Sequence, residues 1–335
     1  MEIGSTKIGS GSVYFIAEAG SNHNGNLEVA KRLASVAAEA GADAVKFQTF
    51  VPEELISAQS DDIDALRELI LEEEEMRLLQ EHTENLGISF LSTPFDEESV
   101  TTLDNLDVDA FKIGSGDLVN HPLLEHAASF SRPLIVSTGM ANKGEIRAAE
   151  NHIKSINPDL NVAFLHCISA YPTEIVDLNL RMMSDIDELV DGPVGFSDHS
   201  RAVETPGLAV ASGASIVEKH FTLSRHLPVP DAEVSLEPDE LAQAVDIARN
   251  AANALGSSKK HPIEAERPNK NEFRKSVHTT TDIPRNTMIN EDDLKLIRPA
   301  DGLKPTELDA VIGTKTRSNL SAGDPITWAD LYIKE

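Results

Sequence analysis

Eight times between residues 13 and 253, a short apolar run is followed by a segment with helical periodicity. The runs occupy residues 13–19, 42–49, 88–93, 109–115, 133–138, 161–167, 193–197 and 215–221. Short apolar runs of this kind are typical of buried strands, and strands that alternate with helices pair in parallel. Eight such units in about 240 residues predict an α/β fold, a (β/α)8 TIM barrel.

The main alternative is an open, doubly wound sheet. Such a sheet, when it binds a dinucleotide, carries a G-x-G-x-x-G motif after its first strand. The loop here reads GSNHNG and lacks that pattern. The barrel is therefore the favoured architecture, covering residues 1–255.

A second region follows the barrel. Residues 256–275 are polar and rich in Lys and Pro, and they are predicted to be a linker. Residues 276–335 show short strand signals and form a small α+β domain. A domain of about 60 residues has a small core, so it is expected to rest on another surface.

Charge and composition exclude several classes of partner. The formal net charge is −27, which argues against nucleic acid and anionic membranes. No apolar run reaches the roughly 18 residues of a membrane span, and the N-terminus has no apolar signal core. The single cysteine, Cys167, lies in an apolar run and cannot form an intrachain disulfide. A cytoplasmic location is expected.

Polar and ionisable residues stand at the carboxyl ends of the predicted strands, where barrels place their active sites. They are Glu18, Lys46, Gln48, Thr93, Lys112, Ser115, Asp117, Ser137, Tyr171, Ser197, His199 and His220. An ionisable group on an apolar strand is destabilised by burial unless it has a partner. A structural role explains one such residue readily, but a whole rim of them predicts a functional site.

The residue types indicate the chemistry. Lys46 and Lys112, with hydroxyls and glycines beside them, are suited to a phosphate or carboxylate. His199 and His220 follow neighbouring strands and are suited to a divalent transition metal with open positions. A metal beside an anion pocket predicts activation of a carbonyl near a phosphorylated partner.

Eight motifs in order at barrel spacing resemble one family. They are IAEAGSNHNG, ADAVKFQTF, FLSTPFD, FKIGSGD, IVSTGM, FLHCISAYP, VGFSDH and EKHFTL. The chain resembles, over nearly its whole length, the sialic acid synthases, which condense phosphoenolpyruvate with an N-acylated mannosamine-type sugar. Its C-terminal region resembles the antifreeze-like (SAF) domain of the same enzymes.

The resemblance implies specific roles. His199 and His220 are the implied ligands of Mn²⁺, with Mg²⁺ or Co²⁺ as alternatives. The implied phosphoenolpyruvate cradle is Lys46, Thr93, Lys112, Ser115, Ser137 and Ser197. Glu18, Lys46, Lys112 and Asp117 are the implied catalytic residues, with Glu18 left open as acid, base or water-orienting group. The implied sugar contacts are Gln48, Tyr171, Asp231, Phe273 and Arg298.

The family further implies a homodimer with exchanged C-terminal domains, in which Arg298 and Phe273 reach the partner's sugar. Three positions depart from the family's pattern. Val229 replaces a glycine two positions before Asp231, and valine rarely adopts the positive φ that is open to glycine. Asp117 replaces a longer glutamate, and the glycine expected after Arg298-Pro299 is displaced to Gly302.

The expected activity is N-acetylneuraminate synthesis from phosphoenolpyruvate, N-acetylmannosamine and water, with release of phosphate. The close alternative is an N,N'-diacetyllegionaminate synthase that uses a 2,4-diacetamido-2,4,6-trideoxymannose; a pseudaminic acid synthase is less favoured. A Schiff-base aldolase using Lys46, Lys112 or Lys219 is more remote, because it leaves the histidine pair unexplained. A carbohydrate-binding or ice-binding protein would leave the charged rim without a purpose.

Overall fold

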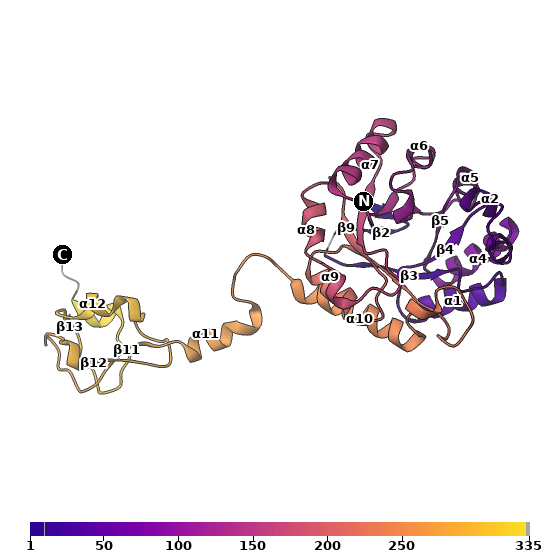
Figure 1. The fold of residues 1–335 in the computed structure, drawn as a ribbon. Helices are drawn as coiled ribbons and strands as arrows, with labels where there is room; N and C mark the ends of the chain where they lie inside the picture. Colours follow the sequence, from indigo (N-terminus) through magenta and orange to yellow (C-terminus); the bar gives the residue numbers. More distant parts are fainter. Residues whose placement is uncertain (10, 333–335) are drawn as a thin grey trace. The chain divides into compact units, whose positions relative to one another are not determined.

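The structure is a computed structural model that describes residues 1–9 and 11–332. The chain forms two compact units, one from Met1 to Gly256 and one from Ser257 onward (Figure 1). Among the described residues, no helix is long and apolar enough to cross a lipid bilayer.

Eight parallel strands close into a barrel in the first unit. They are β3 (Tyr14–Gly20), β4 (Ala44–Thr49), β5 (Ser89–Pro94), β6 (Phe111–Ile113), β7 (Leu134–Ser137), β8 (Val162–Cys167), β9 (Val194–Asp198) and β10 (Ile216–His220). Each strand pairs with the next in sequence, and β10 returns to pair with β3, placing His220 opposite Glu18. The predicted (β/α)8 barrel is confirmed.

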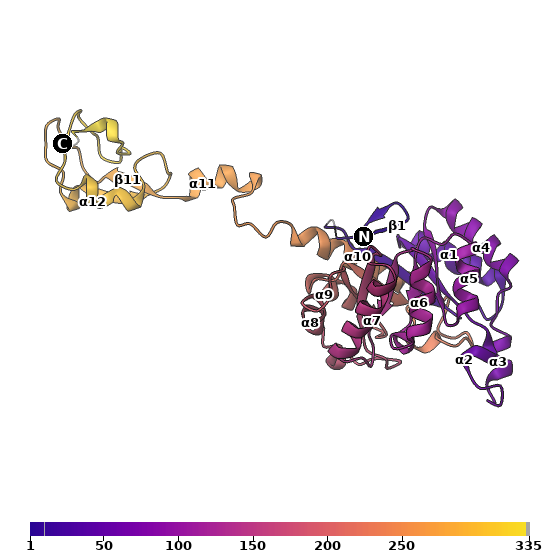
Figure 2. The same cartoon turned by 90° about the horizontal axis from the view of Figure 1, so that it is seen from above.

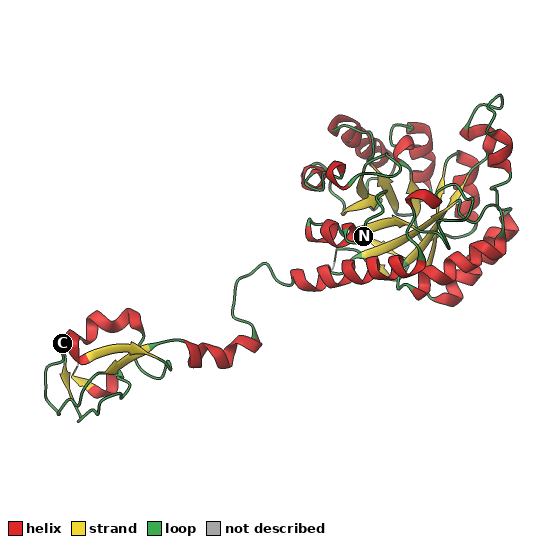
Figure 3. Ribbon diagram, turned by 60° about the horizontal axis from the view of Figure 1, so that its bottom comes forward, coloured by secondary structure: helices red, strands yellow, loops and turns green. Residues whose placement is uncertain are grey.

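Helices surround the strands, as the red and yellow elements of Figure 3 show. They are α1 (Leu27–Glu39), α4 (Glu73–Leu86), α5 (Glu97–Asn105), α6 (His121–Ser129), α7 (Lys143–Ile156), α8 (Met182–Asp187), α9 (Thr205–Ala211) and α10 (Pro238–Leu255). Asn26 caps α1 through its side-chain oxygen, which accepts from the amides of Glu28 and Val29. Gly87 ends α4 in the left-handed region.

The barrel interior is filled differently at its two ends. Toward the strand N-termini it is apolar, with Ile16, Leu91 and Ile135 among the buried side chains. A hairpin of β1 (Glu2–Ile3) and β2 (Thr6–Lys7) adds Ile3 to this cluster. The sequence did not predict the hairpin. With this end packed, the inward-facing polar side chains collect at the opposite end.

Additional short elements follow the strand C-termini. They are α2 (Pro52–Leu55), α3 (Ile63–Arg67), η1 (Ser115–Asp117), η2 (Ile175–Asp177) and η3 (Ala232–Val234). Figure 2 shows β1 and the α2–α3 pair at opposite ends of the barrel. The loops that carry these elements therefore border the polar end.

The second unit has its own small core, which includes Val277, Ile289 and Ile326. Its elements are η4 (Glu264–Glu266), α11 (Arg267–Phe273), β11 (Ser276–Thr279), η5 (Glu291–Asp293), β12 (Leu294–Ile297), η6 (Pro305–Glu307), α12 (Leu308–Val311), β13 (Lys315–Thr316), η7 (Trp328–Asp330) and β14 (Leu331–Tyr332). Strands β11 and β12 form one antiparallel pair, and β13 and β14 another. The segment predicted as a linker contains the helix α11.

Candidate active site

A cavity of about 530 Å³ lies at the carboxyl end of the barrel strands. It is lined by nearly every site residue predicted in the barrel: Glu18, Lys46, Gln48, Thr93, Lys112, Ser115, Ser137, Tyr171, Ser197, His199, His220 and Asp231. The lining residues come from all eight strands or the loops that follow them. The barrel therefore gathers side chains that are up to about two hundred residues apart in sequence.

Two buried lysines reach into this cavity from β4 and β6. The Lys46 ammonium lies 2.8 Å from Glu18 Oε2 and donates to Thr93 Oγ1 at 2.8 Å. The Lys112 ammonium donates to Ser137 Oγ at 2.7 Å. Each lysine is thus held by a small hydroxyl from the neighbouring strand, and the two cations are directed at one space.

Glu218 also lines the cavity, and the sequence reasoning missed it. Its carboxylate lies 3.7 Å from Lys46 Nζ and 3.8 Å from Lys112 Nζ, and Ser197 Oγ donates to it at 2.8 Å. Side chains alternate along a strand, so Glu218 and His220 share the inner face of β10. Because His220 was already predicted to face the site, its spacing of two residues from Glu218 could have identified Glu218 as well.

Lys219, between them, points out of the barrel. Its ammonium is completely buried and is bound 2.7 Å from Asp198 Oδ2 and 2.6 Å from the Ser200 carbonyl oxygen. It does not line the cavity. The Schiff-base alternative therefore loses Lys219 as a candidate amine, and Asp198 and Lys219 act as a structural ion pair behind the site.

Burial and charge together set the protonation of the cavity. Burial raises the pKa of Glu18 well above its usual range, although Lys46 opposes the shift. Burial acts in the same direction on Glu218, but Lys112 and Lys46 outweigh it and hold its pKa below the usual range. Burial lowers the pKa of Lys112, with Glu218 opposing. Glu218 is therefore the firmly ionised carboxylate between the two lysines.

The two predicted metal ligands lie side by side, with ring centroids 5.3 Å apart. His199 Nδ1 lies 2.7 Å from the Ile168 carbonyl oxygen, which orients the ring and leaves Nε2 available. His220 Nδ1 is buried without a hydrogen-bond partner, and burial lowers the pKa of His220 to about 4, so its imidazole is neutral. Neutral, oriented imidazoles are what a divalent transition metal requires. Within the described residues, no group of three His, Cys, Asp or Glu side chains forms a metal-binding set. The two imidazoles alone would supply only part of a metal's coordination sphere.

Sequence comparison connects this geometry to known enzymes. The NeuB family profile matches residues 33–260, and the SAF domain profile matches residues 274–331. The chain belongs to the NeuB family. It is an enzyme of the nonulosonic acid synthase group, which forms a C–C bond between phosphoenolpyruvate and a sugar.

Similar NeuB-family proteins cover almost the full chain. The N,N'-diacetyllegionaminic acid synthase of Legionella pneumophila is 40% identical over 334 residues, covering 94% of this chain and 93% of the relative. The human N-acetylneuraminate-9-phosphate synthase is 34% identical, covering 93% and 91%. The crystal structure of the N-acetylneuraminic acid (sialic acid) synthetase from Leptospira borgpetersenii in complex with citrate is 38% identical. Its TM-score is 0.76, over 80% of this chain and 94% of that one.

Asp231 reaches the cavity of this NeuB-family chain despite Val229. Val229 is not among the residues with positive φ, so the substitution causes no strain there. The Asp231 amide donates to Asn22 Oδ1 at 3.0 Å, which ties the segment to the loop after β3. The Asp231 carboxylate lies 3.8 Å from His220 Nδ1. Its position relative to the histidines is therefore well defined.

Three predicted residues lie elsewhere. Asp117 does not line the cavity; its carboxylate accepts from the Asn120 side chain at 3.0 Å. It sits at the end of the short helix η1, in the GSGD turn that follows β6. Phe273 and Arg298 belong to the second unit, where the Arg298 guanidinium carbon lies 5.3 Å from the Phe273 ring centroid. These two predicted sugar contacts therefore form one stacked pair.

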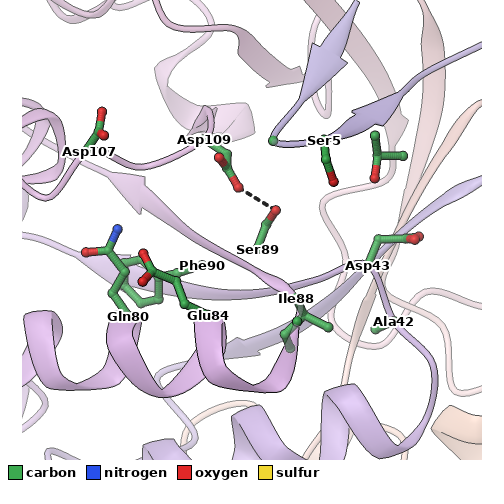
Figure 4. A pocket seen from close by; sticks show the side chains of 13 residues that line it. Ser5, Ala42, Asp43, Gln80, Glu84, Ile88, Ser89, Phe90, Asp107 and Asp109 are labelled. Carbon is green, nitrogen blue, oxygen red and sulfur yellow. Dashed lines mark hydrogen bonds between the residues drawn. The ribbon is translucent and has the colours of Figure 1, made fainter.

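Another cavity, of about 480 Å³, lies at the opposite end of the barrel, next to the N-terminal hairpin (Figure 4). It is acidic, but three of its four carboxylates already have partners. Asp109 accepts from Ser89 Oγ at 2.5 Å, Asp43 lies 2.6 Å from Arg249, and Asp107 lies 2.8 Å from Arg132. Barrel enzymes do not place catalysis at this end. We regard it as a structural cavity.

Proposed function

We propose that this protein condenses phosphoenolpyruvate with the open-chain aldehyde of an N-acylated, mannosamine-type sugar and water, releasing phosphate and a nonulosonic acid. The observation that carries the proposal is the pair of buried lysines, Lys46 and Lys112, each bonded to a small hydroxyl within reach of the histidine pair. A phosphate and a carboxylate on one small molecule match two such cations.

Two sugars are candidates. N-acetylmannosamine is the substrate expected from the sequence, and the 38% identity to a solved sialic acid synthetase supports it. The 2,4-diacetamido-2,4,6-trideoxymannose is supported by the 40% identity to a relative named N,N'-diacetyllegionaminic acid synthase, against 34% for the human enzyme. On that comparison we favour the diacetamido sugar.

The residues of the cavity have separable tasks in this reaction. Lys46 and Lys112 bind the phosphoenolpyruvate anion, with Thr93, Ser115, Ser137 and Ser197 as hydroxyl partners. The methylene carbon of phosphoenolpyruvate attacks the sugar aldehyde carbon to form the new C–C bond. Water then adds at C2, and cleavage of the C–O bond releases phosphate. Glu218 opposes the lowering of the Lys112 pKa that burial causes.

Glu18 is suited to hold or move a proton beside the reacting carbons. Burial raises its pKa, so it can exist in both protonation states near neutral pH. Gln48, Tyr171 and Asp231 line the part of the cavity that we assign to the sugar. Tyr171 stacks on His199 with ring centroids 4.1 Å apart, which places this part next to the histidines.

We further propose that His199 and His220 hold a divalent metal, with Mn²⁺ the first candidate and Mg²⁺ or Co²⁺ the alternatives. When bound, such a metal would polarise the aldehyde oxygen of the sugar as a Lewis acid. The His199 contact to Ile168 and the unpartnered Nδ1 of His220 support this assignment.

We also propose a homodimer in which Arg298 and Phe273 contact the sugar in the partner subunit. The stacking of Arg298 on Phe273 supports a joint role. A mixture of the Lys112→Ala and Arg298→Ala proteins tests it. Each variant alone should have low activity, whereas the mixture should recover part of it, since one subunit pairing then contains an intact site. No recovery after confirmed subunit exchange would refute the shared site.

The activity itself is tested with metal-stripped protein, phosphoenolpyruvate and each sugar in turn, with and without Mn²⁺. Phosphate release and keto-acid formation are measured together. Equal amounts of both products, dependent on Mn²⁺, would support the proposal, and the sugar with the higher kcat/KM is the substrate. Absence of release with both sugars would refute it.

A further inference from the structure

The net negative charge of this protein lies in one of its two units. The barrel unit contains 16 Lys and Arg against 43 Asp and Glu, whereas the second unit contains 13 of each. The whole net charge of −27 thus belongs to the barrel. Against this background, any group of unpaired cations needs an explanation.

Such a group surrounds a cavity of about 540 Å³ within the second unit. Five cationic side chains line it: Arg267, Lys270, Arg274, Lys275 and Lys304. The lining contains no Asp or Glu. Among the described residues, only Arg267 has an ion pair, with Glu264 at 3.0 Å, and the other four cations have none. Like charges repel one another, so their convergence without counter-charges favours a bound anion.

The two walls of the cavity are fixed relative to one another. Helix α11 and its following residues form one wall, and the segment from Ala300 to Thr306 forms the other. The Ala300 amide donates to the Asn271 carbonyl oxygen at 2.9 Å, and Arg298 stacks on Phe273. A Cβ on Gly302 would lie 2.9 Å from the carbonyl oxygens of Val277 and Ile326, so this segment packs directly against the domain. The cations therefore face a preformed cavity.

We propose that this cavity binds a small molecule that carries a phosphate or diphosphate group. Four unpaired cations match a ligand with several negative charges, since charge-assisted hydrogen bonds from Lys and Arg are the strong ones. The volume exceeds that of an inorganic phosphate and is typical of organic-ligand pockets. Ala300, Pro305 and the alkyl stems of the lysines give the organic portion an apolar wall. All of its lining residues belong to the second unit, and the inference does not depend on the proposed reaction.

The test is calorimetric titration of the full-length, metal-stripped protein with inorganic pyrophosphate, near physiological ionic strength. Because the barrel cavity also accepts anions, the titration is repeated with Lys112→Ala protein, in which binding to the second unit should persist. The double variant Lys270→Gln/Lys304→Gln removes one cation from each wall and should weaken this binding at least tenfold. The matched control is Lys315→Gln, an exposed lysine of the same unit outside the cavity, which should change the Kd less than twofold.

Three results would overturn the proposal. One is the absence of saturable binding to the Lys112→Ala protein at millimolar pyrophosphate. Another is equal weakening by Lys315→Gln, which would indicate only a general charge effect. The third is a loss of self-association in the double variant while the parent protein binds no pyrophosphate, which would assign the cations to the acidic barrel of a second copy. Lys270, Lys304 and Lys315 are exposed side chains, and circular dichroism confirms that each variant, including Lys112→Ala, is folded.

Discussion

Gly20 and Asp231 approach so closely that a Cβ on Gly20 would lie 2.7 Å from Asp231 Oδ2. Gly20 also has φ = +52°, a conformation that costs an L side chain about 1–2 kcal/mol. The absence of a side chain at the end of β3 thus allows the aspartate to reach the histidines.

Gly20→Ala should therefore affect both stability and the sugar site. We expect unfolding to become easier by about 1–2 kcal/mol from the backbone conformation alone, and the KM for the sugar to rise at least fivefold. Gly87→Ala is the matched control, because Gly87 has φ = +77° but no atom within 4 Å of the added Cβ. It should lose similar stability with unchanged KM values; an unchanged sugar KM in Gly20→Ala would contradict the role of Asp231.

Glu218→Gln tests the charge balance of the cavity. Removing one member of a buried ionic group leaves the lysines undercompensated and should reduce the free energy of unfolding by about 3–5 kcal/mol. Added phosphate should restore more stability in this variant than in the parent protein, since the anion replaces the lost charge. Chemical denaturation with and without phosphate measures both effects.

The control for this variant is Glu233→Gln, which removes an exposed ion pair with Arg201. Exposed pairs contribute little, so its effect should stay below about 0.5 kcal/mol. Equal stability of the two variants would mean that Glu218 does not balance the buried lysines.

His199→Ala and His220→Ala should each abolish tight Mn²⁺ binding while the protein remains folded. Loss of one of two protein ligands should raise the Kd for the metal at least 100-fold, as titration calorimetry of stripped protein would show. His226→Ala, at an exposed histidine outside the cavity, should bind Mn²⁺ normally. Stoichiometric binding in both cavity variants would refute the metal assignment.

The lowered pKa of His23 should make the stability of the protein depend on pH. Burial lowers its pKa from 6.5 to about 4, and its Nδ1 accepts from the Gly25 amide at 3.1 Å, so the native state holds the neutral ring. The unfolded chain takes up the proton first as the pH falls. The stability from the neutral ring is therefore complete above about pH 6.5 and is lost as the pH falls toward about 4.

His23→Asn should make the decrease in the free energy of unfolding at acidic pH smaller by about 2–3 kcal/mol. The asparagine Oδ1 can still accept from the Gly25 amide. Urea unfolding of metal-free protein across this pH range measures the difference, with His226→Asn as the exposed control. Parallel stability curves for the parent and the His23→Asn protein would contradict the prediction.

The barrel could be predicted because the spacing of hydrophobic residues identifies each strand and helix from its own sequence, without knowledge of tertiary contacts. The rim residues followed from the same strand positions, since a barrel assigns one end of every strand to the site. The β1–β2 hairpin and α11 were missed because strands of two residues and a helix of seven show too little periodicity to recognise.

Two side-chain placements escaped the sequence analysis for a similar reason. Glu218 lies in a run of three polar residues, Glu218-Lys219-His220, where hydrophobicity does not show which side chains point inward. The barrel closure decides it, by placing Glu218 and His220 inside and Lys219 against Asp198. Asp117 was predicted from the GSGD turn and from the family resemblance, and neither shows that its carboxylate bonds to Asn120 outside the cavity lining.

The register of β10 against β3 places His220 beside Glu18, at the seam where the first and last strands of the barrel meet. During translation Glu18 is synthesised early, and its neighbour His220 is added about two hundred residues later. The cavity is therefore complete only when β10 pairs with β3 and closes the barrel. Chains cut short before β10 would lack His220, Glu218 and the closure itself, so we expect incomplete translation products to be inactive.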